Sequence, residues 1–372
     1  MSLICNVVGA RPNFMKMAPI ILEERRRGLN QLTVHTGQHY DSQMSDVFFE
    51  ALGMPQPDSH LGIGSGSHAE QTARVMVGFE KICLDSRPDL VVVGGDVNST
   101  LACALVAAKL LIPVAHVESG LRSFDRTMPE EINRILTDHI ASLLFTTEQS
   151  GNDNLLREGI AAERIHFVGN SMIDSLRANI DKALAERSWQ RFGLEPGHYG
   201  LVTLHRPANV DEPNVFLEIA AALTEISRDI PLLFPVHPRT RGHIEKIGID
   251  LNAVKLIEPL GYMEFLGLMA KAGVVLTDSG GIQEETTALG VPCVTIRLNT
   301  ERPVTVQLGT NRLAGISKSN IVNAAREAMC KDKGNVALPP FWDGHAAPRI
   351  LDVIAQWQFK CRGTKHTLKR DL

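Results

Sequence analysis

Short apolar runs alternate with helical patterns along almost the whole chain of 372 residues. Each run is four to six residues long, as expected of strands buried on both faces of a sheet. The runs are Leu3–Val8, Leu32–Thr36, Leu90–Val93, Val114–Val117, Leu143–Thr146 and Ile165–Val168, then Gly200–Leu204, Leu232–Val236, Val254–Ile257, Val274–Thr277 and Val291–Ile296. The helical patterns between them include Thr100–Leu111, Pro129–Ala141, Asn214–Ser227 and Gly281–Leu289. This alternation predicts an α/β fold with parallel sheets covered by helices on both faces.

The alternation is interrupted once, near Gly169–Gly197, where a polar helical pattern is followed by a segment rich in Gly and Pro. A chain of this length is also more typical of two domains than of one. We therefore predict two doubly wound domains, an N-terminal domain over residues 1–168 and a C-terminal domain over residues 169–347. The last helix, within residues 348–372, is expected to return to the first domain.

Composition limits the class of protein. The chain is 44% hydrophobic and 22% charged, typical of a globular protein, and its net charge of −4 argues against nucleic acid as a partner. The six cysteines form no C-x-x-C pair and read as reduced thiols, which predicts a cytoplasmic protein. The start does not resemble a signal peptide, and no apolar stretch approaches the ~20 residues of a membrane span, so no membrane association is expected.

The segment from Ala272 to Gly290, AGVVLTDSGGIQEETTALG, carries the clearest functional signal. A buried strand there turns through Ser279, Gly280 and Gly281 into a helix. Such a turn presents backbone N–H groups and the positive end of the helix dipole to an anion. Glu285, one turn later, is placed to bind a ribose diol. The pattern indicates a site for a nucleotide diphosphate, and the alternative is a turn whose glycines only allow close packing.

Charged side chains and histidines follow the predicted strands in both halves of the chain. Those positions are Arg11 and Lys16, Asp96, Glu118, His205 and Arg206, His237, and Asp278 with Ser279. Ligands of open parallel sheets bind outside the carboxyl ends of the strands. Loops are polar everywhere, which explains any one of these residues, but not why so many are Asp, Glu, His and Arg. We expect two domains whose reactive residues face each other across a cleft.

The motif PEEINR begins the helix predicted at Pro129. Thr127 and Glu130 have the spacing of a capping box, so Glu130 has a possible structural role at the helix start. Glu130 also lies close to the expected cleft, one helical turn from Arg134. A catalytic or substrate-binding role for Glu130 therefore stands beside the capping role.

Cofactor and metal motifs are absent from the sequence. GARPNFMK follows the first strand in place of G-x-G-x-x-G, so no dinucleotide cofactor is expected. The 13 histidines are dispersed, and no His/Cys cluster has the spacing of a metal site. The chemistry is therefore expected to depend on acids, bases and a bound phosphate, without a cofactor or metal.

Seven motifs in order resemble those of the non-hydrolysing UDP-N-acetylglucosamine 2-epimerases. They are GARPNFMKMAP, GGDVNST, HVESGLR, PEEINR, TLHRPANV, TDSGGIQEE and TERP, and they run from Val8 to about Arg302. A weaker similarity follows at Asp343–Ala346. The resemblance implies two Rossmann-like domains in the GT-B arrangement, the second binding UDP, and members of the family are commonly homodimers.

The resemblance also implies a role for each matched residue. Arg11, Ser279, Gly280 and Gly281 match positions that hold the UDP phosphates, Glu285 matches the ribose-binding carboxylate, and Phe265 matches a residue beside the uracil. Lys16, Arg134 and Arg302 match cations that face the substrate. The residues that match the catalytic set are Asp96, Glu118, Glu130 and His205.

The implied reaction interconverts UDP-N-acetylglucosamine and UDP-N-acetylmannosamine, precursors of surface polysaccharide. Carbon 2 of the sugar has no adjacent carbonyl, so its proton leaves most easily while the bond from carbon 1 to UDP breaks. This elimination gives a bound 2-acetamidoglucal, and UDP adds back after protonation from the other face. Two faces require two groups that handle protons. Which of Asp96, Glu118 and Glu130 serves which face is left open.

Two features leave the substrate open. Gln38-His39-Tyr40-Asp41 replaces a QHR-type segment, and the loop Ser123–Met128 is short, so activation by a second UDP-N-acetylglucosamine is in doubt. The chain resembles the QHYD-bearing branch of the family, for which a UDP-diacetamido uronic acid is an alternative substrate. A GT-B glycosyltransferase, a hydrolysing epimerase and a non-catalytic sensor of nucleotide sugars are the competing functions.

Overall fold

The computed structural model describes residues 2–9, 11–37, 49–236, 238–248, 251–330 and 337–368. The chain divides into two compact units. Unit 1 contains Met1–Ser175 and Pro340–Leu372, and unit 2 contains Leu176–Pro339. The sequence places these divisions after residues 168 and 347, whereas the units divide after residues 175 and 339. Helix α7 (Ser171–Ala185) carries the chain from the first unit to the second.

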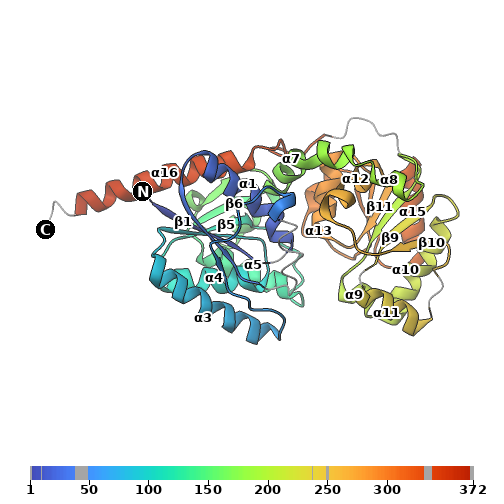
Figure 1. The fold of residues 1–372 in the computed structure, drawn as a ribbon, viewed down its shortest axis with the longest axis horizontal. Helices are drawn as coiled ribbons and strands as arrows, with labels where there is room; N and C mark the ends of the chain where they lie inside the picture. Colours follow the sequence, from blue (N-terminus) through green and yellow to red (C-terminus); the bar gives the residue numbers. More distant parts are fainter. Residues whose placement is uncertain are drawn as a thin grey trace. The chain divides into compact units, whose positions relative to one another are not determined.

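Unit 1 is built on a seven-stranded sheet in the order β3-β2-β1-β4-β5-β6-β7. Figure 1 labels β1, β5 and β6 of this sheet. Its strands are β1 (Leu3–Val8), β2 (Asn30–His35), β3 (Ser59–His60), β4 (Leu90–Gly94), β5 (Val114–Ser119), β6 (Leu143–Thr146) and β7 (Ile165–Phe167). Its helices are α1 (Arg11–Arg26), α3 (His68–Ser86), α4 (Asn98–Lys109), α5 (Pro129–Ile140), α6 (Gln149–Arg157), the short 3₁₀ helix η1 (Ala162–Arg164) and α16 (Ala346–Leu368). The strand order reverses direction between β1 and β4, which is where open sheets of this type bind ligands.

The returning helix α16 packs on helix α1 of the same unit. Arg27 Nη1 at the end of α1 lies 2.6 Å from Asp352 Oδ1. The start of α16 is capped by Asp174, whose carboxylate accepts hydrogen bonds from the backbone N–H groups of Ala346 (3.1 Å) and Ala347 (2.8 Å). A carboxylate at a helix N-terminus satisfies N–H groups that have no partner within the helix. Asp174 therefore fixes the point at which the chain rejoins unit 1.

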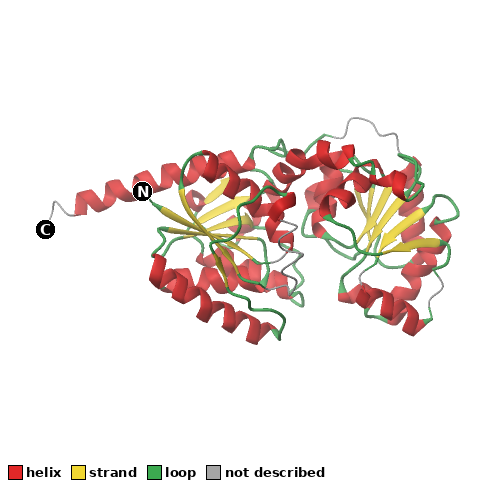
Figure 2. Cartoon of the chain, viewed as in Figure 1, coloured by secondary structure: helices red, strands yellow, loops and turns green. Residues whose placement is uncertain are grey.

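Unit 2 repeats the plan with six strands in the order β10-β9-β8-β11-β12-β13. Its strands are β8 (Gly200–Thr203), β9 (Leu232–Pro235), β10 (Val254–Ile257), β11 (Val274–Thr277), β12 (Cys293–Thr295) and β13 (Asn311–Leu313). Its helices are α8 (Ser188–Arg191), α9 (Pro207–Val210), α10 (Pro213–Ile226), α11 (Pro238–Ile247), α12 (Tyr262–Lys271), α13 (Gly280–Leu289), α14 (Pro303–Gln307) and α15 (Lys318–Cys330). In Figure 2 the strands of each unit lie between layers of helices.

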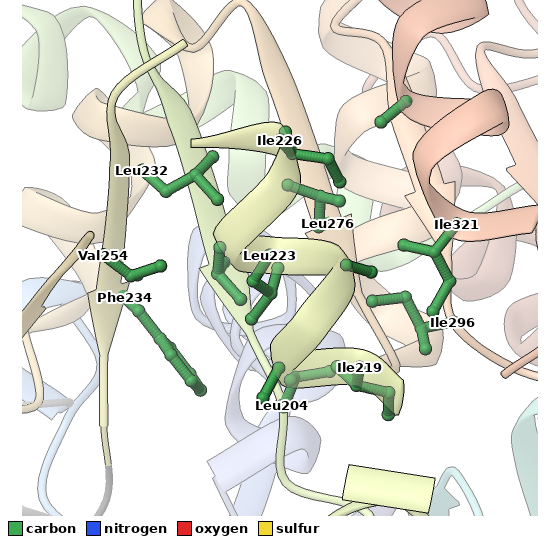
Figure 3. Close-up of a cluster of buried hydrophobic side chains, with 14 of the residues drawn as sticks. Leu204, Ile219, Leu223, Ile226, Leu232, Phe234, Val254, Leu276, Ile296 and Ile321 are labelled. Atoms are coloured by element: carbon green, nitrogen blue, oxygen red, sulfur yellow. The ribbon is translucent and has the colours of Figure 1, made fainter. Parts of the chain in front are cut away.

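Apolar side chains of the strands and helices form the core of unit 2 (Figure 3). Leu223 and Ile226 of α10 pack with Leu276 of β11, and all three side chains are fully buried. Fully burying an aliphatic side chain of this size contributes about 1.5–3 kcal/mol. The 3.6-residue spacing of the apolar positions in α10 therefore accounts for both the helix and its position on the sheet.

The strand pairs recorded among the described residues are parallel. The predicted α/β class with two doubly wound sheets is confirmed. Strands β1, β6, β10 and β11 have the predicted bounds, whereas the edge strands β3 and β13 are not among the predicted apolar runs. Within the described ranges, none of the helices has both the length and the apolarity that crossing a bilayer would require.

Candidate functional site

The carboxyl end of β5 in unit 1 holds a buried ion pair. Lys16 Nζ, from the second turn of α1, lies 2.5 Å from Glu118 Oε2, and the two side chains are 6% and 3% exposed. A buried charge is tolerated only when it is paired, because water no longer solvates it. Lys16 follows β1 and Glu118 lies at the end of β5. The pair therefore joins two predicted site residues from opposite sides of the position where the strand order reverses.

Glu118 has an unusual backbone conformation. Its φ is +68°, in the left-handed region that side chains other than glycine rarely adopt. The register of β5 against β6 shifts between Val117 and Ser119, so Glu118 is the extra residue of a β-bulge. Strain of this kind costs on the order of 1–3 kcal/mol and is concentrated at functional sites. The bulge directs the Glu118 side chain toward Lys16.

A second carboxylate, Asp96, follows β4. Arg134 of α5 donates to Asp96 Oδ2 from Nε (3.0 Å) and approaches the same oxygen with Nη2 (2.9 Å). Arg134 Nη1 also donates to Glu131 Oε2 (2.5 Å). The Asp96 side chain remains 19% exposed, in contrast to Glu118. Arg134 thus fixes the orientation of Asp96 and leaves part of this carboxylate accessible.

The two adjacent glutamates of α5 have different surroundings. Glu131 is buried and accepts hydrogen bonds from the backbone N–H groups of Ser123 (3.0 Å) and Phe124 (2.9 Å), so it orders the preceding loop. Glu130 is half-buried at the start of the helix. The predicted capping box is wrong, because the N-cap of α5 is Met128 and no side chain caps it. Thr127 instead donates to Asp125 Oδ1 (2.6 Å).

In unit 2, the ends of β8 and β11 form a histidine–aspartate pair. His205 Nδ1 lies 2.8 Å from Asp278 Oδ1, and the buried Asp278 carboxylate also accepts from the backbone N–H groups of His205 (3.1 Å) and Arg206 (2.9 Å). Burial alone would raise the pKa of Asp278, but His205 and these N–H groups outweigh it, so that its pKa lies below the usual value. The His205 side chain is 59% exposed. The pair therefore presents an oriented imidazole to solvent.

Helix α13 begins where β11 ends, as predicted. Ser279 is the N-cap residue but makes no side-chain capping bond. A Cβ on Gly280 would collide with the guanidinium of Arg302, so a larger residue here would displace that side chain. Arg302 is buried between Glu284 (Nε–Oε1, 2.9 Å) and Glu301 (Nη1–Oε1, 2.5 Å). The glycine turn thus accommodates a buried guanidinium beneath the first turn of α13.

The remaining predicted residues of unit 2 lie on α12 and α13. Glu285 is 6% exposed, and Phe265 is half-buried. Burial raises the pKa of Tyr262 well above its usual value, and the nearby Glu285 carboxylate adds to this effect. Tyr262 and Phe265, at the start of α12, thus lie on the element adjoining Glu285.

Some predicted positions fall outside the described part of the chain. Arg11 is the first residue of α1, but its side chain is not described, and neither His237 nor the segment Gln38–Asp41 is among the described residues. Within the described ranges, no group of three or more His, Cys, Asp or Glu side chains could hold a metal ion.

The family profile described as UDP-N-acetylglucosamine 2-epimerase matches residues 22–355, which is most of the chain. The chain belongs to this family. A UDP-N-acetylglucosamine 2-epimerase of Methanocaldococcus jannaschii is 43% identical over 363 residues, covering 95% of this chain and 99% of the relative. A UDP-2,3-diacetamido-2,3-dideoxy-D-glucuronate 2-epimerase of Pseudomonas aeruginosa is also 43% identical over 363 residues, with the same coverage.

A solved structure extends the similarity to three dimensions. The crystal structure of the M. jannaschii UDP-GlcNAc 2-epimerase in complex with UDP-GlcNAc and UDP has a TM-score of 0.88 to this chain. It is 43% identical in sequence, and the match covers 96% of this chain and all of that one. This member of the epimerase family therefore has the same fold as the M. jannaschii enzyme.

Sequence reasoning about this epimerase missed the residues that hold the predicted ones in place. The sequence places Asp278 at a strand end but does not predict its contact with His205, and it does not single out Glu131 or Glu301. The rule that strand ends adjoining the point of reversal lie together gives a signal for Asp278, because β8 and β11 are neighbours there. The sequence gives no such signal for Glu131, because only its deeper burial in the structure distinguishes it from the adjacent Glu130.

Proposed function

We propose that this epimerase-family protein interconverts UDP-N-acetylglucosamine and UDP-N-acetylmannosamine without hydrolysing them. The observation that carries the proposal is the pair of carboxylates at adjacent strand ends of unit 1, Asp96 held by Arg134 and Glu118 held by Lys16. Inversion at carbon 2 requires one group that removes a proton and one that returns it to the opposite face. Two carboxylates in different surroundings meet that requirement.

The proposed reaction is an elimination followed by an addition. One carboxylate takes the proton from carbon 2, a double bond forms between carbons 1 and 2, and the C1–O bond electrons leave with UDP. The products are UDP and 2-acetamidoglucal. A second proton then reaches carbon 2 from the other face, and a phosphate oxygen of UDP bonds again to carbon 1. The step at carbon 1 requires stabilisation of a developing negative charge on the diphosphate.

Unit 2 supplies groups suited to that charge. Ser279, Gly280 and Gly281 are at the start of α13, where the helix dipole favours an anion. We assign Arg11 to the diphosphate as well, Glu285 to the ribose and Phe265 to the uracil. His205, oriented by Asp278, is the proposed proton donor to the departing phosphate. Lys16, Arg134 and Arg302 act in this scheme by holding Glu118, Asp96 and the α13 turn.

A second candidate substrate follows from the comparisons. The P. aeruginosa relative named for a UDP-diacetamido glucuronate is as similar to this chain as the M. jannaschii enzyme. The elimination is the same for both sugars, because both carry an acetamido group at carbon 2. We therefore propose UDP-N-acetylglucosamine as the substrate and the diacetamido uronate as the alternative.

Incubation of UDP-N-acetylglucosamine with the pure protein in deuterated water tests the proposal. We expect deuterium at carbon 2 and formation of UDP-N-acetylmannosamine, and the diacetamido uronate is assayed in parallel to determine the preferred sugar. Accumulation of free N-acetylmannosamine would identify a hydrolysing enzyme. Acceptor-dependent UDP release without deuterium uptake would identify a glycosyltransferase, and binding without turnover a sensor.

Matched variants separate binding from chemistry. Asp96→Asn and Glu118→Gln remove a proton-handling group and are expected to abolish deuterium uptake while UDP still binds. Glu285→Ala is expected to weaken UDP binding because it removes the proposed ribose contact. Wild-type affinity for UDP in the Glu285 variant would contradict that assignment.

We also propose a cytoplasmic homodimer that supplies surface polysaccharide synthesis. The described cysteines are free thiols, which is typical of a reducing compartment. Val77 and Leu84, exposed on α3 by 60% and 55%, provide apolar surface that pairing would bury. Analytical ultracentrifugation tests the dimer, and a monomer at micromolar concentration would contradict it.

A further inference from the structure

His116 is a fully buried histidine in the centre of unit 1 for which the proposed reaction has no role. It lies on β5, two residues before Glu118. Its Nδ1 lies 2.7 Å from Asp138 Oδ1 of α5, and its Nε2 lies 2.8 Å from the carbonyl oxygen of Gly95. Gly95 directly precedes Asp96. The imidazole thus joins the strand that carries one proposed catalytic carboxylate to the loop that carries the other.

The two ring nitrogens of His116 have different partners. A backbone carbonyl has no proton to donate, so Nε2 must carry one. Burial alone raises the pKa of Asp138, but His116 and Arg122 outweigh it and bring its pKa below the usual value. The Asp138 carboxylate therefore holds the ring at Nδ1, while Nε2–H donates to the Gly95 carbonyl oxygen.

Asp138 is itself held by several donors. Its Oδ2 accepts from the backbone N–H of Gly120 (3.1 Å) and lies 2.8 Å from Arg122 Nη1. Arg122 in turn donates to both carboxylate oxygens of Glu158, each at 2.8 Å. These contacts fix the residues that follow the Glu118 bulge. Asp138 thus holds the end of β5 directly and the end of β4 through His116.

The loop that His116 contacts is closely packed. Gly95 has a φ of +67°, and a Cβ there would lie 2.9 Å from Lys16 Nζ. The backbone N–H of Gly95 also donates to the Val117 carbonyl (3.0 Å). A shift of this loop would therefore change the position of Asp96 and the space available to the Lys16–Glu118 pair together.

We propose that His116, held by Asp138, is a positioning residue that sets the geometry of Asp96 relative to Glu118. This inference rests on the proposed epimerase function. Two proton transfers on opposite faces of one carbon need both carboxylates at fixed distances from it, and a displacement of about 1 Å can cost 10²-fold in rate. His116 does not touch the substrate, so its contribution is to the rate of proton exchange and not to binding of UDP.

Two substitutions separate the contacts of the ring. An asparagine amide occupies roughly the position of Nδ1, and a glutamine amide roughly that of Nε2. His116→Asn therefore loses the contact with Gly95, whereas His116→Gln retains a donor to it. We expect kcat for deuterium exchange to fall by about 10² in His116→Asn and to recover in part in His116→Gln, with UDP affinity unchanged in both.

His139→Gln is the matched control, because His139 is exposed, is next to Asp138 in sequence, and contacts the Ile135 carbonyl oxygen of its own helix with its ring nitrogen Nδ1 (2.8 Å). Its kcat should equal that of the wild type. Equal kcat losses in His116→Asn and His116→Gln, or no loss in either, would overturn the positioning role.

The contact with Gly95 is tested on the wild-type protein and does not depend on activity or on the folding of a variant. Nitrogen-15 NMR of labelled histidine is expected to show a proton on Nε2 of His116, the nitrogen that lies 2.8 Å from the Gly95 carbonyl oxygen. An Nε2 that carries no proton would overturn the inference. Absence of deuterium exchange in the wild type would instead refute the proposed function, and the NMR result would be unaffected.

Discussion

The ion pair between Lys16 and Glu118 gives a quantitative prediction about unit 1. The atoms are 2.5 Å apart, and neither side chain is more than 6% exposed. Removing one partner takes away the charge that compensates the other within the buried pair, which costs about 3–5 kcal/mol of unfolding free energy. We therefore expect Lys16→Met and Glu118→Gln each to destabilise unit 1 by about that amount.

The double variant is expected to be much less destabilised than the sum of the two single variants. Replacing both partners removes the buried charge altogether and leaves only a neutral amide at position 118, which costs less than an uncompensated buried charge. The coupling energy between the two positions should therefore exceed about 2 kcal/mol, in the upper part of the range seen for residues in contact. Glu118→Gln keeps the strained backbone, so its strain does not contribute to the difference.

Urea unfolding measures these energies. Trp342 is buried in unit 1 and donates from Nε1 to the carbonyl oxygen of Thr147 (2.9 Å). Its fluorescence reports this unit alone once Trp189 and Trp357 are replaced by phenylalanine. Arg26→Met on the same helix is the control and should change little, because that side chain is 70% exposed.

Two results would refute this reasoning. Single variants within about 1 kcal/mol of the wild type would show that the pair is not desolvated as its burial indicates. Additive losses in the double variant would show that the two side chains act independently.

Two further predictions concern Asp278 and Glu24. Asp278→Asn should lower the rate of deuterium exchange by at least about 10² while UDP binding persists, because the imidazole of His205 loses the carboxylate that orients it; an unchanged rate would contradict this. Burial raises the pKa of Glu24 from 4.5 to about 8, with Asn6 opposing the shift. The folded state therefore keeps a proton that the unfolded state loses above pH 4.5, and stability falls as pH rises to 8. Glutamine cannot titrate, so in Glu24→Gln the free energy of unfolding should no longer lose the roughly 4–5 kcal/mol that Glu24 costs the wild type between pH 4 and pH 8. Urea unfolding at both pH values measures this difference.

Much of the fold could be predicted because its strands are apolar runs. The bounds of β1 and β11 follow directly from Leu3–Val8 and Val274–Thr277, whose side chains are almost all buried. The edge strand β3 could not be predicted, because Ser59 and His60 are polar and pair with β2 on one side only. An edge strand of two residues needs no apolar pattern, since the sheet beside it supplies the hydrogen bonds.

The strand-end positions of the candidate site residues follow from the sequence, but their contacts do not. The rule for strand ends selects Asp96, Glu118 and His205, because topology alone determines which loops adjoin the reversal of strand order. The left-handed backbone of Glu118 could not be foreseen, since sequence preferences assign that conformation to glycine and the tertiary contacts override them here. Predicting the partner of Arg134 requires the packing of α5 against the sheet, which the local sequence does not determine.

The return of the chain to unit 1 affects the order of folding during synthesis. Residues Leu176–Pro339 leave the ribosome as one continuous segment that contains every strand of its own sheet. The earlier unit must wait for Trp342, and for helix α16 with the cap that Asp174 provides, before its packing is complete. Unit 1 therefore begins to be translated first but completes its packing last.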